Sequence, residues 1–117
     1  MNLHEFVRAL RTHDALTARQ WVADAMRAGL RLAELSKPAG LDAVDLAIAA
    51  GVVELLASRW NQRSPDWTRD VPPAPVPVFL VRAAANLPRL RRICETEGPE
   101  PLRRRRLLAP PDFLTAA

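Results

Sequence analysis

The sequence predicts an all-α fold: a small helical domain of four to six helices with a proline-rich crossover. Apolar residues recur at helical spacing through the first half, whereas most of the 11 prolines follow Ser64 and interrupt the second half. The length of 117 residues suits one domain, which at this size buries roughly two-thirds of its unfolded surface. We expect one helical domain over 1–117, with N-terminal helices at 1–61, a proline-rich crossover at 62–77, and C-terminal helices with a docked tail at 78–117.

The first 29 residues are expected to form a helical hairpin. Asn2 and Glu5 resemble a capping box at the start of a helix that runs to about Thr12. This helix carries one apolar stripe: Leu3, Phe6, Val7 and Leu10. A second helix is expected from Thr17, before a left-handed end at Gly29. Its core-facing residues would be Trp21, Val22, Ala25 and Met26, and residues 30–36 would add a further helical turn.

A central helix is expected over 42–61. Leu41 and Leu46 stand where a hydrophobic staple would flank an Asp42 cap. Apolar residues then cover more than one helix face, as in a helix packed on two or three sides: Val44, Ile48, Val52, Leu55, Leu56 and Trp60. Glycine at position 51 costs about 1 kcal/mol of helix stability relative to alanine. Its presence in the middle of this helix therefore predicts that another helix crosses closely there. An aspartate in place of Leu56 is expected to unfold the domain.

The segment after Asn61 differs from the first half of the chain in its residue pattern and proline content. It has no helical stripe, and Pro72, Pro73, Pro75 and Pro77 favour extended polyproline geometry. Trp67 indicates that the segment lies across the core, because an indole left in water would forfeit a few kcal/mol of burial energy.

Helix is expected to resume from Val78. Asn86 would cap a helix that has Pro88 in its first turn and reaches Glu97. The residues expected to face inward are Leu87, Leu90, Ile93 and Cys94. The charged residues between them would be mostly solvated.

Charge is unevenly distributed along the chain. Residues 1–60 contain seven Arg or Lys and seven Asp or Glu, whereas residues 61–117 contain ten and six, so the net charge of +4 comes from the second half. Such asymmetry hints at an acidic partner. Because 16 of the 17 basic residues are arginine, a GC-rich coding sequence explains the same composition. Both interpretations stay open.

The sequence favours the cytoplasm and excludes a membrane protein. The single cysteine, Cys94, cannot form an intramolecular disulfide, and the start MNLHEF lacks the features of a signal peptide. The longest apolar run, 43–57, is shorter than the roughly 20 residues of a bilayer span and contains Asp45 and Glu54.

No catalytic chemistry is visible in the sequence. Two histidines and one cysteine are too few for a recognisable metal cluster, and the four glycines are too dispersed to cradle a phosphate. His13 beside Asp14 could be a base with its orienting carboxylate, but a surface pair at a helix end is the favoured alternative. We predict no enzyme, no cofactor, no metal and no catalytic residue.

Two features could contact nucleic acid. Ala25 precedes the turn at Gly29 by four positions, as in helix-turn-helix units, although an ordinary helical hairpin uses the same residues. The run Arg103–Arg106 gathers four cations, as phosphate binding requires. Since no aromatic residue interleaves them and successive helical residues point about 100° apart, a mixture of salt bridges and solvent contacts is favoured.

The stretch PEPLRRRRLLAPPDFL, residues 99–114, is expected to be ordered and docked. Its leucines and Phe113 provide more apolar surface than a disordered basic tail needs. Leu102 and at least one of Leu107 and Leu108 should be buried. Replacing the four arginines by glutamine is expected to leave the fold intact, because exposed ion pairs contribute only about 0–1 kcal/mol each.

The second half of the chain resembles a known family. The order SPDWT, a proline-rich gap, LPRLR, GPEPLRRRRLL and a closing DFLTAA is similar to the C-terminal module of certain bacterial antitoxin-like proteins. The match covers about half of the chain, from Ser64 onward. The resemblance implies a folded C-terminal module and a partner of the nucleotidyltransferase-like toxin class. The N-terminal half departs from the family pattern because it lacks a convincing recognition helix.

The sequence thus predicts a non-enzymatic protein-binding subunit, antitoxin-like or an accessory partner of a bacterial protein. Its candidate partner-binding residues are aromatic or arginine, the types that dominate interface hot spots: Trp67, Phe79, Arg103, Arg104, Arg105, Arg106 and Phe113. The three aromatic residues could instead only pin the crossover to the core. The alternative function is a nucleic-acid-binding protein that uses its arginine-rich C-terminal half.

Overall fold

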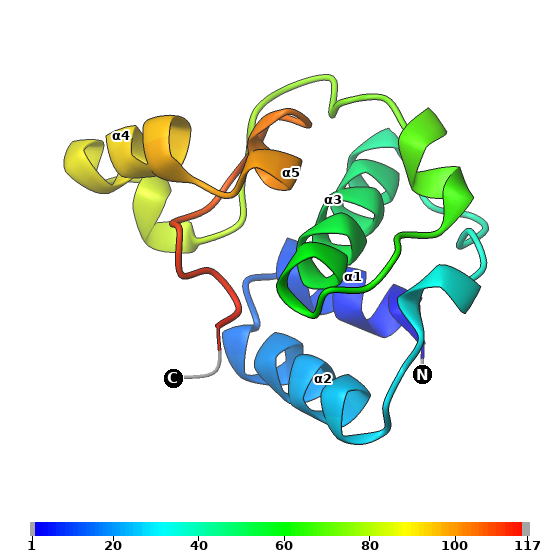
Figure 1. Cartoon of the computed structure of the whole chain (residues 1–117). Coiled ribbons are helices and arrows are strands. Elements are labelled where there is room, and N and C mark those ends of the chain that lie inside the picture. Colours follow the sequence, from blue (N-terminus) through cyan, green and yellow to red (C-terminus); the bar gives the residue numbers. More distant parts are fainter. Residues whose placement is uncertain (1, 116–117) are drawn as a thin grey trace.

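The computed structural model describes residues 2–115 and confirms the predicted all-α class (Figure 1). Five α-helices follow one another: α1 (Leu3–Arg11), α2 (Ala15–Arg27), α3 (Ala43–Arg59), α4 (Pro88–Glu97) and α5 (Glu100–Arg103). Short elements connect them: the 3₁₀ helices η1 (Leu32–Glu34), η2 (Asp66–Asp70) and η3 (Arg82–Ala85), and the strands β1 (Val78–Phe79) and β2 (Leu107–Leu108).

Helices α1 and α2 form the predicted hairpin. Asn2 caps α1, its Oδ1 accepting a hydrogen bond of 2.9 Å from the His4 amide. The predicted start of the second helix at Thr17 is wrong, because Asp14 is the cap. Its carboxylate accepts from the Thr17 hydroxyl at 2.7 Å and from the Thr17 amide at 3.1 Å. These two hydrogen bonds hold the pKa of Asp14 below its ordinary value.

Helix α2 ends before Gly29, which has the predicted left-handed conformation. Gly29 has a φ of 66°, and the Leu30 amide donates to the Ala25 carbonyl at 2.9 Å. The Gly29 amide donates to the Met26 carbonyl at 3.1 Å. Together the two hydrogen bonds make a complete Schellman motif. Trp21 stacks on Phe6 of α1 with 4.3 Å between ring centroids. The prediction that Met26 faces the core is wrong, since it is 58% exposed.

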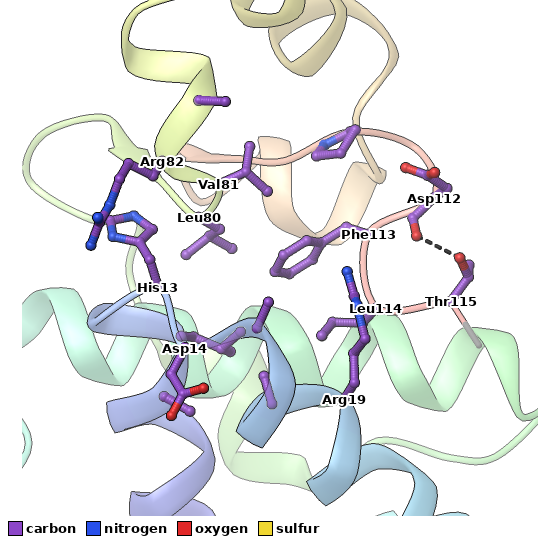
Figure 2. A pocket seen from close by; sticks show the side chains of 16 residues that line it. His13, Asp14, Arg19, Leu80, Val81, Arg82, Asp112, Phe113, Leu114 and Thr115 are labelled. Atoms are coloured by element: carbon purple, nitrogen blue, oxygen red, sulfur yellow. Dashed lines mark hydrogen bonds between the residues drawn. The ribbon is translucent and has the colours of Figure 1, made fainter. Parts of the chain in front are cut away.

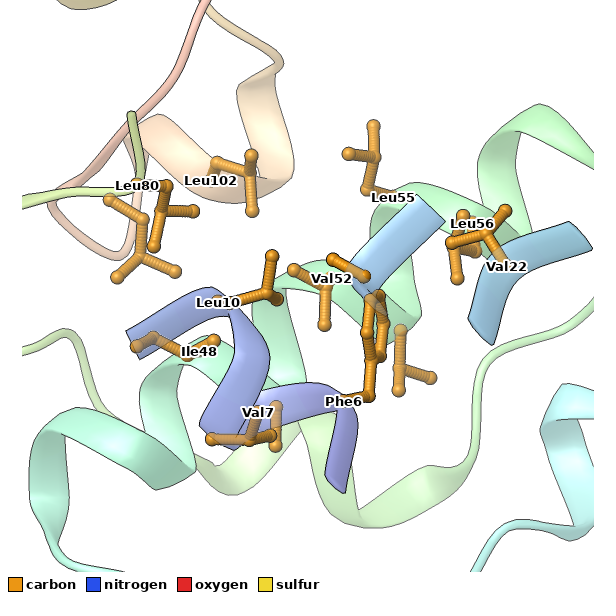
Figure 3. Packing of buried hydrophobic residues seen from close by; sticks show 14 of the residues in the cluster. Phe6, Val7, Leu10, Val22, Ile48, Val52, Leu55, Leu56, Leu80 and Leu102 are labelled. Atoms are coloured by element: carbon orange, nitrogen blue, oxygen red, sulfur yellow. The ribbon is translucent and has the colours of Figure 1, made fainter. Parts of the chain in front are cut away.

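Helix α3 is the central helix, as predicted (Figure 3). Asp42 caps it by accepting from the Asp45 amide at 2.8 Å, and every residue from Ala47 to Ala57 is buried. The close crossing at Gly51 is also confirmed. A Cβ added there would lie 2.8 Å from Leu107 Cδ1 and 3.1 Å from Leu102 Cδ2. None of the described helices is long and apolar enough to cross a membrane.

The crossover lies against the core rather than hanging free. Trp67 in η2 is half-buried and donates its Nε1–H to the Leu35 carbonyl at 2.8 Å. Val71 and Ala74 are buried further along. The Ala74 amide donates to the Arg105 carbonyl at 3.0 Å, which joins the crossover to the C-terminal segment.

The C-terminal part corrects three predictions. Val78 begins a strand instead of a helix, with Val78 opposite Leu107 and Phe79 opposite Leu108 in a parallel pair. Leu87, not Asn86, occupies the cap position of α4, and Leu87 is 53% exposed instead of facing inward. A backbone that already pairs with β2 leaves too few residues for a long helix before Pro88, so the helix shortens to η3 and α4.

Residues 99–114 are docked, as predicted. Leu102 and Leu107 are completely buried and Leu108 is 8% exposed. Leu102 of α5 packs over α3 beside Leu80 (Figure 3). The main core cluster therefore includes residues from α1, α2, α3, the crossover and the C-terminal segment.

Candidate functional site

The four arginines of the run each have a different environment. Arg103 donates to the carbonyls of Gly98 (2.7 Å) and Thr96 (3.3 Å) at the end of α4. Arg106, whose φ is 63°, donates to the Pro75 carbonyl at 2.9 Å. Arg104 and Arg105 both reach Glu54 of α3. The run thus binds its own fold at three places: the end of α4, the Pro75 carbonyl and the shared Glu54 carboxylate.

The pair formed by Arg105 and Glu54 is buried. Arg105 is 5% exposed and Glu54 is 8% exposed. Arg105 donates to both Glu54 carboxylate oxygens and, at 2.6 Å, to the Thr68 carbonyl. Burial raises the pKa of Glu54, but hydrogen bonds from Arg104 and Arg105 outweigh it and hold the pKa below its ordinary value.

The premise that the four arginines are exposed is therefore wrong for Arg105. A buried guanidinium cannot be replaced by glutamine at the small cost of a surface ion pair, because the replacement strands the Glu54 carboxylate in the core. Arg104, half-exposed at 49%, shares that carboxylate from the surface and also pairs with Glu100. The flanking apolar residues explain this burial, since Leu102 and Leu107 anchor both ends of the run.

The three aromatic candidates are all packed within the domain. Trp67 is fixed by its bond to Leu35. Phe79 is half-buried beneath Arg91, whose guanidinium carbon lies 5.2 Å from the ring centroid, a cation–π arrangement. Phe113 is 9% exposed. Of the three, Phe113 alone lines a cavity among those described.

A cavity of about 550 Å³ lies where α2, η3 and the C-terminal segment meet (Figure 2). Leu80 and Phe113 point into it from its two walls, and α2 contributes Ala15 and Ala18. These short alanine side chains leave the space that larger residues would fill. The lining is therefore mainly apolar, with charged groups at its edges.

A second hollow of about 370 Å³ continues along α2. Arg19, Leu114 and Thr115 line both spaces, and the exposed Met26 lines the second. We call the two together the α2 groove. Most of its residues on α2 follow one helix face, with Arg27 at the end of the helix beside them: Ala15, Ala18, Arg19, Val22, Ala23 and Met26.

The far wall of the α2 groove is held in place by α3. Arg59 donates to the Phe113 carbonyl and, at 3.1 Å, to the Pro111 carbonyl. Burial lowers the pKa of Arg59, and the nearby Asp112 carboxylate opposes that change. The Thr115 hydroxyl closes a local turn by donating to the Asp112 carbonyl at 2.6 Å (Figure 2). The wall is thus preformed.

Two arginines flank the first cavity from opposite sides, Arg19 on α2 and Arg82 on η3 (Figure 2). Within residues 2–115, neither forms an ion pair with an acidic side chain. The two acidic residues of the lining are engaged elsewhere: Asp14 caps α2, and Asp112 lies near Arg59. The lining therefore carries two positive and two negative side chains.

The suggested dyad of His13 and Asp14 is not formed. His13 Nε2 lies 2.9 Å from the Phe79 carbonyl and so donates its proton there, whereas the Asp14 carboxylate accepts from Thr17. His4 makes the same type of bond to the Ala39 carbonyl at 2.8 Å. Among residues 2–115, no three His, Cys, Asp or Glu side chains are grouped to hold a metal ion.

The possible helix-turn-helix lacks its second helix. After Gly29 the chain forms η1, a 3₁₀ helix of three residues, and the next α-helix begins at Ala43. Gln62 fixes this segment by accepting from the Leu32 amide at 2.9 Å and donating to the Leu30 carbonyl at 3.1 Å. The unit offers no helix for a DNA groove.

Comparison with protein-family models, with curated proteins and with solved structures gives no match for this chain.

Sequence reasoning found Phe113 but missed the rest of the α2 groove. Arg19 and Arg82 carry no local motif, and they line one cavity only because η3 and the C-terminal segment lie next to α2. Glu54 did give a signal: a lone carboxylate within the buried stretch of an apolar helix requires a cationic partner. The nearest basic run, Arg103–Arg106, could have been assigned to it.

Proposed function

We propose that this protein is a non-enzymatic protein-binding subunit and that the α2 groove receives a segment of its partner. The observation that supports this function is the preformed, mainly apolar groove beside Met26, a large side chain left 58% exposed. Apolar surface that a monomer leaves uncovered next to a hollow is typical of interaction sites.

The groove, rather than the arginine run, is the proposed contact surface. Arg103, Arg105 and Arg106 donate to carbonyl or carboxylate groups of the same chain. Phosphate binding would compete with these bonds. The nucleic-acid alternative therefore depends on arginines outside the run, and a nucleotidyltransferase-like toxin remains the partner class that the family resemblance suggests.

A peptide-display selection tests this function. Random peptides are selected on the wild-type protein, and the recovered binders are measured against Met26→Glu, which places a charge in the groove at an exposed site. The matched control is Leu87→Glu, since Leu87 is 53% exposed and lies on the separate helix α4. We expect binders rich in apolar residues that lose at least tenfold affinity for Met26→Glu and keep it for Leu87→Glu.

Salt dependence separates the alternative. An apolar peptide complex should survive a rise from 50 to 200 mM salt, whereas a phosphate binder making several contacts should lose affinity by orders of magnitude. Selection that yields no groove-dependent peptide, together with salt-sensitive binding of unrelated DNA or RNA sequences, would replace this proposal by nucleic-acid binding.

A further inference from the structure

We propose that η3 and α4 form a lid, residues 82–97, which opens over the first cavity while α1, α2, α3 and the C-terminal segment stay folded. In the closed structure η3 forms part of one wall of this cavity, through Arg82 and Ala83 (Figure 2). Opening would remove that wall and widen the cavity. The lid opens in the free protein, so its motion does not depend on the proposed function or on a bound partner.

Both ends of the lid are fixed at one place on the C-terminal segment. Just before the lid, the Leu80 amide donates to the Leu108 carbonyl at 2.9 Å. Just after it, Gly98 lies so close to Ala109 that a Cβ added to the glycine would be 2.5 Å from the Ala109 carbonyl oxygen. The lid therefore leaves and rejoins the main fold at neighbouring residues, and its opening does not pull on the rest of the chain.

The lid buries few of its own side chains. Cys94 is the one buried residue of α4, and Ala84 is the one buried residue of η3. They pack with Leu108 in a small cluster outside the main core. Figure 1 shows α4 apart from α1, α2 and α3. Because segments with few buried apolar contacts open at a lower free energy than the whole domain unfolds, the lid should open first.

Two arginines help to hold the lid closed. Arg103 of α5 donates to the carbonyls of Gly98 at 2.7 Å and Thr96 at 3.3 Å, at the end of α4. Arg91 lies over the Phe79 ring of β1, 5.2 Å from its centroid. Both arginines are exposed, so these contacts add only modest stability to the closed lid.

The thiol of Cys94 reports the opening, because it is completely buried in the closed lid and is the single cysteine of the chain. Its alkylation by iodoacetamide is measured at several urea concentrations below the unfolding transition. Urea denaturation gives the rate that global unfolding alone would allow. We expect labelling about 100-fold faster than that rate or more, with a shallower dependence on urea, because opening the lid exposes less surface than unfolding the domain.

Three variants localise the opening. Arg103→Gln removes the bonds to α4, whereas the control Arg106→Gln removes a bond of the same type to the Pro75 carbonyl of the crossover. Arg103→Gln should label about threefold faster than wild type or more, and Arg106→Gln at the wild-type rate. Ile48→Val weakens the main core, where Ile48 is completely buried, and should leave the labelling rate unchanged.

Hydrogen exchange under the same conditions should show the amides of η3 and α4 opening together with Cys94, while those of α3 stay protected. Labelling that follows the urea dependence of global unfolding, or that Ile48→Val accelerates in step with its loss of stability, would overturn the lid. Equal labelling rates in Arg103→Gln and Arg106→Gln would overturn it as well. Exchange in α4 while η3 stays protected would confine the motion to one helix and leave the cavity wall fixed, contrary to the proposal.

Discussion

Removing the carboxylate of Glu54 should destabilise the protein far more than removing an exposed arginine of the run. In Glu54→Leu the Arg105 guanidinium, 5% exposed, stays in the core without its anion. Breaking one partner of a buried ion pair costs about 3–5 kcal/mol. Native domains have a total stability of only about 5–15 kcal/mol, so this single change should remove a large part of it.

The double variant Glu54→Leu/Arg105→Met separates lost pairing from lost packing. It removes both charges and fills the site with apolar side chains of similar length, so it should be more stable than Glu54→Leu alone. The Thr68 carbonyl keeps a partner, because it also accepts from the Val71 amide at 3.3 Å. The loss of stability in the double variant should therefore be well below the sum of the losses in Glu54→Leu and Arg105→Met measured singly.

Urea denaturation followed by circular dichroism measures these free energies of unfolding. Arg104→Gln is the matched control, because Arg104 bonds the same carboxylate but is half-exposed at 49%. It should cost about 1 kcal/mol or less. Equal losses for Glu54→Leu and Arg104→Gln, or simple additivity in the double variant, would refute the assignment of Arg105 and Glu54 as a buried pair.

Three further predictions follow from the core and its charges. Leu56→Asp should abolish the cooperative thermal transition, because Leu56 is 1% exposed and an unpaired buried charge costs several kcal/mol; an unchanged Tm would contradict this. Gly51→Val should lower the free energy of unfolding by about 1–3 kcal/mol, since its Cβ would meet Leu107 at 2.8 Å; equal stability in urea would show that α3 and α5 can separate. The stability difference between wild type and Glu54→Gln should be full above a pH near 4.5, the ordinary pKa of glutamate, and shrink as pH falls below it, because pairing lowers the pKa of Glu54 in the folded state; a difference that grows in acid would give the opposite sign.

The sequence by itself determined that α1, α2 and α3 form, and most of the residues that they bury. The limits of α3, the cap at Asn2 and the stop at Gly29 depend on interactions within a few residues, so local spacing predicts them. Burial of Leu102 and Leu107 follows from apolar content between prolines. These features need no knowledge of how distant segments meet.

Local rules also produced the errors. Thr17 is an acceptable cap and Val78 an acceptable helix start, but the Asp14 cap and the pairing of β1 with β2 override them. A side-chain bond to Thr17 decides the first case, and a partner nearly 30 residues away in sequence, Leu107 opposite Val78, decides the second. Such long-range pairing leaves no periodic signal in either segment.

Only the tertiary structure decided the role of the arginine run and the position of the α2 groove. Four adjacent arginines look alike in sequence, yet Arg105 is buried against Glu54 while Arg103 and Arg106 cap carbonyls at the surface. Arg19 and Arg82 line one cavity because η3 and the C-terminal segment, which Arg59 holds through the Phe113 carbonyl, both lie next to α2. Desolvation and charge depend on what surrounds a side chain in space, and that environment comes from segments far apart in the chain.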